Sequence, residues 1–69
     1  PNPVSGAVQL DAPESFRVQT VRVYNALGVP VHNVSGNIRS MDFNGWVPGW
    51  YVVEISGNEG VFRQKILVR

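Results

Sequence analysis

The sequence predicts an all-β domain, an Ig-like antiparallel β-sandwich of six or seven short strands. Val, Ile and aromatic residues outnumber Ala and Leu, and they suit the half-buried surface of a pleated sheet. Several segments alternate apolar and polar residues with a period of two, and none carries an apolar stripe at helical spacing. Turn residues separate these segments at short intervals. An open barrel built from the same strands is the alternative architecture.

The first two strands follow from this alternation. The pattern covers residues 7–10 and, more strongly, residues 19–24. Pro13-Glu14-Ser15 interrupts the chain between them, because proline and small polar residues favour turns. The side chains expected to face the core are Val8, Leu10, Val21 and Val23.

A third and a fourth strand are expected over residues 29–34 and 38–43. Residues 25–28 supply the turn before the third strand. Pro30 has no backbone N–H to donate to a neighbouring strand, so the third strand should lie at a sheet edge. The buried side chains of the fourth strand are expected to be Met41 and Phe43.

The last two strands, residues 50–56 and 61–68, are predicted to form an antiparallel hairpin. Residues 56–60 are rich in Gly, Asn and Ser and turn the chain. The core side chains predicted here are Tyr51, Val53, Ile55, Phe62, Ile66 and Val68. The charged side chains predicted on the opposite face are Arg63, Lys65 and Arg69. This basic row is either a docking surface or the solvated face of an edge strand.

Length and composition exclude several classes of protein. The chain has 69 residues, enough for one domain of small net stability covering residues 1–69. It has no Cys, so neither a disulfide framework nor a thiolate metal site is expected. The net charge of +1 is too small for a phosphate-binding surface, and nucleic acid is not expected as a partner. No apolar run has the length of a membrane span, and residues 1–3 do not resemble a signal peptide.

The sequence does not indicate catalysis. His32 is the single histidine and stands in a strand-like stretch, as a surface histidine would. The five carboxylates are scattered singly, and the glycines form no nucleotide-binding loop. No cluster of His, Asp and Glu has the spacing of metal ligands. We therefore expect neither an enzyme, nor a cofactor, nor a metal site.

Three aromatic residues near the fifth strand allow two interpretations. Trp46, Trp50 and Tyr51 either form a platform that stacks on a sugar ring or cap the end of a small core. Capping is the commoner use of such residues in a small domain. A surface module that binds carbohydrate or protein through this Trp-containing loop is the alternative function.

Five blocks of sequence, in order along the whole chain, carry a resemblance to a known family. They are residues 1–6 with Val8 and Leu10, and then residues 21–28, 41–43, 48–55 and 65–69. Together they resemble the type A C-terminal sorting domain of the type IX (Por) secretion system of Bacteroidetes. The residues of the family pattern expected to be structural are Asn2, Pro3, Gly28, Gly49 and Tyr51. The chain departs from the pattern at Phe43, where Leu is common, and at Gln64, where a second basic residue often stands.

The resemblance implies a sorting signal carried at the C terminus of a larger exported protein, with the cargo attached in cis. Such domains are Ig-like sandwiches that fold in the periplasm and are recognised by an outer-membrane translocon. In most cargo a sortase-like peptidase then removes the domain at the cell surface.

The last strand suits such a role physically. A terminal strand offers unpaired backbone groups along one edge, which permits recognition by strand addition. The same property gives an isolated domain a route to self-association. The suspected recognition residues are Lys65, Ile66, Leu67, Val68 and Arg69. Gly28 and Gly49 stand at strand boundaries and should have positive φ or lie where a side chain would clash.

Overall fold

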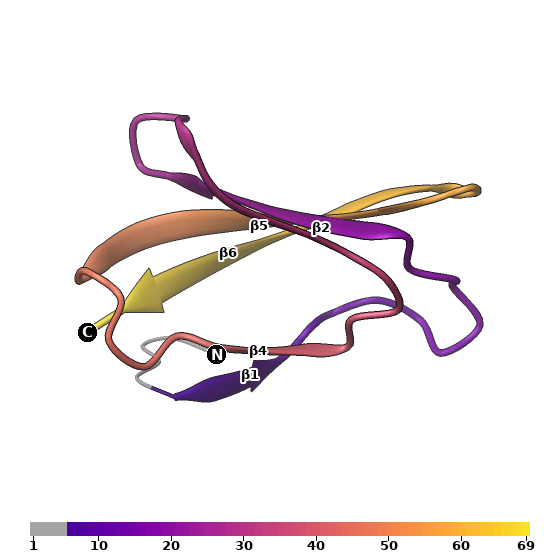
Figure 1. Ribbon diagram of the computed structural model, residues 1–69, viewed down its shortest axis with the longest axis horizontal. Coiled ribbons are helices and arrows are strands. Elements are labelled where there is room, and N and C mark those ends of the chain that lie inside the picture. The colour runs from indigo at the N-terminus through magenta and orange to yellow at the C-terminus, as the bar shows by residue number, and fades with distance from the viewer. Residues whose placement is uncertain (1–5) are drawn as a thin grey trace.

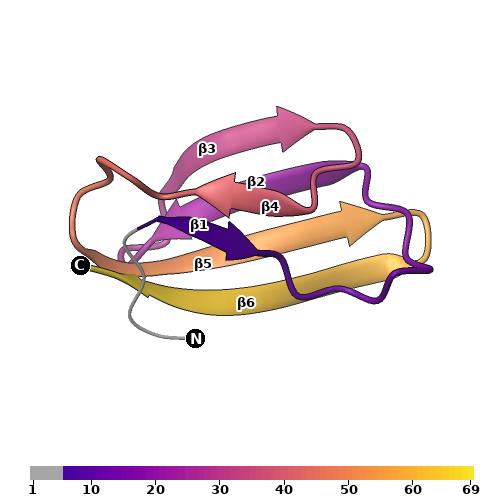
Figure 2. The ribbon, with the colours of Figure 1, turned by 90° about the horizontal axis from the view of Figure 1, so that it is seen from below.

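A computed structural model describes residues 6–69, which form six strands and no helix. The strands are β1 (Ala7–Gln9), β2 (Thr20–Asn25), β3 (Pro30–Ser35), β4 (Ser40–Asp42), β5 (Gly49–Gly57) and β6 (Gly60–Val68). They form a two-stranded sheet, β1-β4, and a four-stranded sheet in the order β3-β2-β5-β6. All pairs are antiparallel. The sheets face each other (Figures 1 and 2), which confirms the predicted all-β sandwich.

The strand boundaries follow the alternation closely, with one exception. β4 has three residues, whereas the sequence predicts a strand over residues 38–43. Its partner β1 also has three residues, so neither strand has a longer ladder to join. Single hydrogen bonds continue the pairing beyond the ladder, from Leu10 N to Arg39 O at 2.9 Å and from Phe43 N to Gly6 O at 3.1 Å.

The core lies between the two sheets and contains the residues that the alternation predicts. Tyr51, Val53, Ile55, Ile66 and Val68 are buried, as are the inward side chains predicted for the first, second and fourth strands. The buried hydrophobic residues are Val8, Leu10, Phe16, Val18, Val21, Val23, Met41, Phe43, Tyr51, Val53, Ile55, Ile66 and Val68.

Phe62 is a correction to the predicted core. It lies opposite the buried Ile55 and so faces inward, but 36% of its surface is exposed. The short strands of the smaller sheet cover only part of the nine-residue strands β5 and β6. Phe62 therefore reaches the rim, where its ring meets Phe16 edge-on with centroids 4.9 Å apart.

The loop between β1 and β2 closes the core, and Arg39 holds it in place. Phe16 and Val18 in this loop are buried although they belong to no strand. The Arg39 Nη2 atom donates to three backbone carbonyl oxygens at 2.9 to 3.1 Å, those of Pro13, Glu14 and Phe16. One guanidinium group thus holds the backbone of this loop, which belongs to no strand.

Residues 6–69 contain no helix that is long and apolar enough to cross a membrane.

Candidate recognition site

The last strand, β6, forms a regular hairpin with β5. Asn58 and Glu59 make a two-residue loop between Gly57 and Gly60, which face each other. The register continues without a shift to the pair Gly49 and Val68. β6 is therefore a nine-residue strand without a bulge at the edge of the larger sheet (Figure 2).

The suspected recognition residues of β6 divide between its two faces. Ile66 and Val68 are buried in the core, at 0% and 2% exposure. Lys65 and Arg69 are exposed, and Leu67 is partly exposed. The buried pair fixes the backbone of the strand and so the direction of Lys65, and Arg69 follows directly after the last residue of β6.

The charged side chains of β6 have different neighbours on the outer face of the sheet. Arg63 Nη2 lies 3.0 Å from Glu54 Oε2, and the Tyr24 hydroxyl donates to Glu54 Oε1 at 3.4 Å. Lys65 Nζ instead lies 5.0 Å from the ring centroid of Trp50, a cation–π arrangement. Arg63 thus has a carboxylate as its neighbour, whereas Lys65 has an aromatic ring.

The backbone of β6 has an open side. The pair that closes a two-residue hairpin loop exchanges both hydrogen bonds, so every second residue from Gly60 onward bonds to β5. Consistent with this alternation, the Ser56 carbonyl accepts from Gln19 N at 2.8 Å, on the side away from β6. The N–H and C=O groups of Val61, Arg63, Lys65 and Leu67 therefore point to the free edge. Within residues 6–69, no backbone hydrogen bond from outside the hairpin reaches them.

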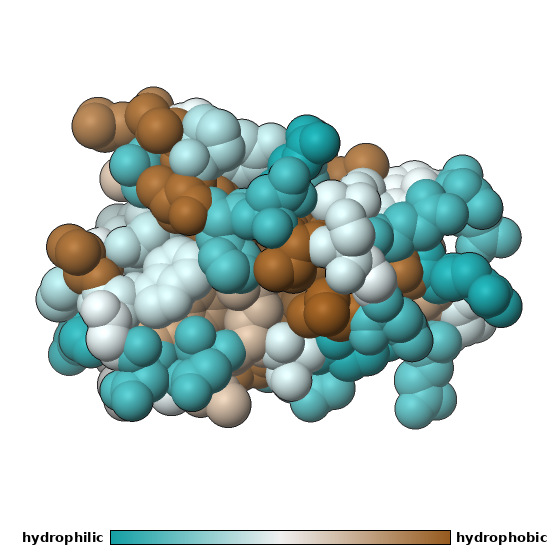
Figure 3. Space-filling view, in the orientation of Figure 1, coloured by the Kyte–Doolittle hydropathy of each residue, from teal (hydrophilic) through white to brown (hydrophobic). Residues whose placement is uncertain are grey.

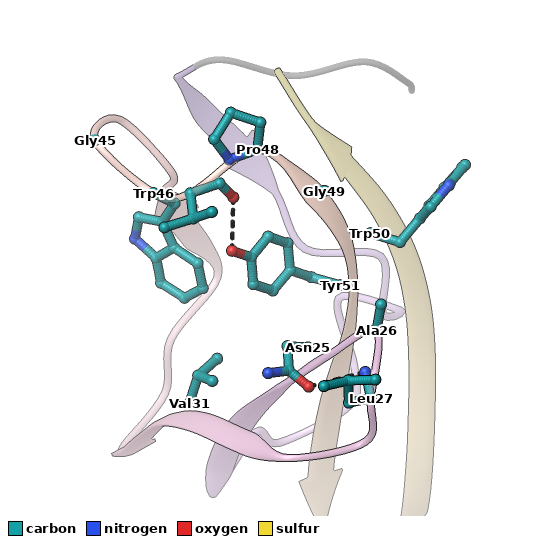
Figure 4. A pocket seen from close by; sticks show the side chains of 11 residues that line it. Asn25, Ala26, Leu27, Val31, Gly45, Trp46, Pro48, Gly49, Trp50 and Tyr51 are labelled. Atoms are coloured by element: carbon teal, nitrogen blue, oxygen red, sulfur yellow. Dashed lines mark hydrogen bonds between the residues drawn. The ribbon is translucent and has the colours of Figure 1, made fainter.

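The aromatic residues near β5 do not form a common platform. Trp46 packs edge-on against Phe43 and Tyr51, with centroid distances of 4.8 and 5.2 Å. Trp50 points to the other side of β5 (Figure 4) and is 41% exposed. Trp46 and Tyr51 thus cap the core, and Trp50 contributes to the outer face instead.

An apolar cleft lies between the β2–β3 turn and the loop before β5 (Figure 4). These two loops lie at the end of the sandwich where β6 ends (Figure 1). Its volume is about 560 Å³, and its lining residues include no charged side chain. Leu27 and Val47 line the cleft and are 87% and 74% exposed. Hydrophobic side chains project at this end of the molecule in Figure 3.

Two hydrogen-bonding side chains shape the loops around this apolar cleft. Asn25 Oδ1 accepts from the backbone N–H groups of Leu27 and Val29, both at 3.0 Å. The Tyr51 hydroxyl donates to the Val47 carbonyl oxygen at 2.6 Å (Figure 4). The sequence predicts Asn25 only as a turn residue. An Asn at the start of a turn commonly accepts hydrogen bonds from the backbone of that turn, so this role of its side chain was also predictable.

Comparison with protein-family models identifies the family of the chain. A family model described as the secretion system C-terminal sorting domain matches residues 1–69, the whole chain. The chain belongs to this family of type IX sorting domains. Neither the comparison with curated proteins nor the comparison with solved structures gives a match.

Membership defines what the sorting domain does in outline. It is a C-terminal sorting signal of type IX secretion, which implies interaction with that machinery and an attached cargo in cis. It also implies export of the cargo toward the outer membrane or the cell surface. The family is not a family of enzymes, and residues 6–69 contain no group of three or more side chains placed to hold a metal ion.

The structure describes three of the family-pattern residues of this sorting domain, Gly28, Gly49 and Tyr51. Gly28 and Gly49 have φ values of +81° and +148°, which confirms the predicted positive φ, and a Cβ atom at either would meet open space. Tyr51 is buried and ties the loop before β5 to the core through its hydroxyl. Asn2 and Pro3 lie outside the described residues.

Proposed function

We propose that the outer-membrane translocon of the type IX system recognises this sorting domain through β6, with residues 65–69 as the recognition segment. In this proposal the domain is the C-terminal part of a larger precursor. The attached cargo reaches the surface of a Bacteroidetes-type Gram-negative bacterium. The observation that supports the proposal is the division of β6 into a buried face and an exposed basic face beside an open edge.

The physical argument concerns the cost of recognition. A flexible signal loses conformational entropy when a receptor binds it, at about 1–2 kcal/mol for each residue whose backbone becomes ordered. Ile66 and Val68 already hold β6 in the folded domain, so Lys65 is presented in a strand that is ordered before binding, and Arg69 follows directly after its end. A folded strand is thus a better signal than the same five residues in a free tail.

A sortase-like peptidase removes the domain from the exported cargo in this proposal. The support is the family resemblance, since cargo of this family commonly loses its sorting domain at the surface. Mass spectrometry of the surface-exposed cargo tests this step. A cargo that ends before Pro1 is expected, and an exported cargo that retains residues 1–69 would show that this domain is a permanent part of its protein.

Transfer of export to an unrelated protein tests the proposed function. Residues 1–69 are fused to the C terminus of a reporter that carries an inner-membrane signal peptide, in a bacterium with a type IX system. The reporter should reach the cell surface. The same fusion without residues 65–69 should remain in the periplasm, and equal surface display of both fusions would disprove the proposal.

The apolar cleft favours a second candidate function, a surface module that binds a partner through the Trp-containing loop. Leu27 and Val47, which line the cleft, are exposed aliphatic side chains, and the lining of the cleft includes few polar groups. Such a surface fits a protein better than a carbohydrate, which needs several hydrogen bonds. A binding module would retain its ligand without supporting export of the reporter, and Val47→Ser would weaken that binding.

A further inference from the structure

The two edges of the larger sheet differ in how open they are to another strand. β3 begins at Pro30, which lacks an N–H group, and its register with β2 shifts between Val23 and Tyr24. β6 has nine residues, no proline and no shift in its register with β5. Prolines and bulges are features that block strand addition. β6 is therefore the edge at which a further strand fits.

The side chains along this open edge are basic. Arg63, Lys65 and Arg69 lie on the outer face with Leu67. The outer-face residues Val61, Arg63, Lys65 and Leu67 are also the ones whose backbone N–H and C=O groups point to the open edge. Within residues 6–69, Arg63 alone among these cations has an ion-pair partner, Glu54. A strand added here would place its own side chains directly opposite this basic row.

A second copy of the domain does not suit this edge. If two β6 strands pair antiparallel with Lys65 at the centre, Lys65 faces Lys65 of the second copy. A shift of the register by two residues places Arg63 opposite Lys65 in one direction, and Arg63 opposite Arg69 in the other. Each of these registers opposes two cations, which destabilises a strand pair.

We propose that β6 accepts an extended acidic strand of the type IX machinery, which joins the sheet beside β6 and places carboxylates opposite Lys65 and Arg63. The proposal rests on the proposed function and adds the chemistry of the partner. Backbone hydrogen bonds to the odd-numbered residues of β6 contribute affinity that does not depend on the sequence of the added strand. The carboxylates determine the specificity for the partner, because opposite charges across a strand pair attract and like charges repel.

Peptides of opposite charge test the proposal on the chain of residues 1–69. One labelled peptide has the length of β6, nine residues, with Glu at the positions that face Arg63 and Lys65 and β-branched residues elsewhere. The matched peptide has Lys in place of both Glu residues. Fluorescence anisotropy should show that the Glu peptide binds at least about tenfold more tightly than the Lys peptide.

A charge reversal in the domain separates recognition from folding. Lys65→Glu changes an exposed side chain and should leave the melting temperature nearly unchanged, while the preference between the two peptides falls or reverses. Arg17→Glu is the matched control, because Arg17 is an exposed arginine in the loop between β1 and β2 and belongs to no strand. That control should keep the preference for the Glu peptide.

Backbone amide signals report where the peptide binds. The Glu peptide should protect the amides of Val61, Arg63, Lys65 and Leu67 from hydrogen exchange without changing those of Gln64 and Ile66, which already bond to β5. Equal affinity for the two peptides would overturn the acidic partner, and protection that does not follow this alternation would overturn strand addition.

The reporter export assay distinguishes failure of this inference from failure of the proposed function. If the reporter is exported but the peptides bind equally, the sorting role stands and the acidic-strand inference is wrong. If the peptides discriminate as expected and the reporter is not exported, the edge interaction is real and the proposed function is wrong.

Discussion

Arg39 is expected to contribute a large share of the stability of the domain. Its Nη2 atom donates to three carbonyl oxygens of the loop between β1 and β2, and the bond to Phe16 O is partly buried. Arg39→Ala removes all three donations and frees the loop that carries the buried Phe16 and Val18. A hydrogen bond from a charged group contributes about 1.5–3 kcal/mol when partly buried, and the two exposed bonds add little.

The expected loss is about 2–3 kcal/mol in the free energy of unfolding, from a total of about 3–10 kcal/mol for a domain of this length. At about 4–8 °C for each kcal/mol, the melting temperature should fall by about 8–24 °C. Circular dichroism during heating measures this shift. Arg39→Lys should recover only part of the loss, because an ammonium group lacks the planar fork of the guanidinium group.

Arg22→Ala is the matched control for Arg39→Ala. Arg22 is an exposed arginine on the outer face of β2, and its removal should change the melting temperature by only a few degrees. If Arg39→Ala and Arg22→Ala melt at the same temperature, the account of the loop is wrong.

Three further substitutions test the packing. Val53→Asp should leave the domain largely unfolded in a denaturant titration, because a carboxylate at this fully buried position has no partner; an unchanged midpoint would show that the predicted face of β5 is wrong. Gly57→Ala should cost about 1–3 kcal/mol by the same titration, because the added Cβ meets the Arg17 backbone oxygen and the Phe16 ring, and a stability equal to the parent would contradict this close approach. Tyr51→Phe should cost about 1 kcal/mol and increase hydrogen exchange in the loop after Trp46, whereas exchange at the parent rate would mean that the hydroxyl does not hold the loop.

The strands were predictable because each alternates between a core and a solvated face. Val21 and Val23 are fully buried while Arg22 between them is exposed, and this difference appears directly as a period of two in the sequence. The position of β3 at an edge was also predictable, since Pro30 cannot donate to a neighbouring strand. Both features depend on residues that are adjacent in the chain.

The features of the fold that the sequence does not predict depend on contacts between residues that are distant in the chain. Phe16 and Val18 are buried by a loop without alternation, and the Arg39 side chain that holds this loop comes from more than twenty residues further along the chain. The partial exposure of Phe62 depends on how far the smaller sheet extends. No local pattern encodes these distances.

The candidate site was predictable to a similar extent. Alternation alone separates Lys65 and Arg69 from Ile66 and Val68, as the structure confirms. It does not show that Lys65 lies over Trp50 or that Arg63 pairs with Glu54, because these contacts depend on the register between β5 and β6.

The most direct test of the central claim is the export of a reporter fused to a domain in which Lys65 and Arg69 are both replaced by Gln. The melting temperature should be nearly unchanged, because exposed charges contribute under about 1 kcal/mol each. Surface display of the reporter should fall, and the reporter should accumulate in the periplasm as a folded fusion. If this variant folds and is displayed as well as the parent, the basic side chains of β6 are only its solvated face, and recognition through them is wrong.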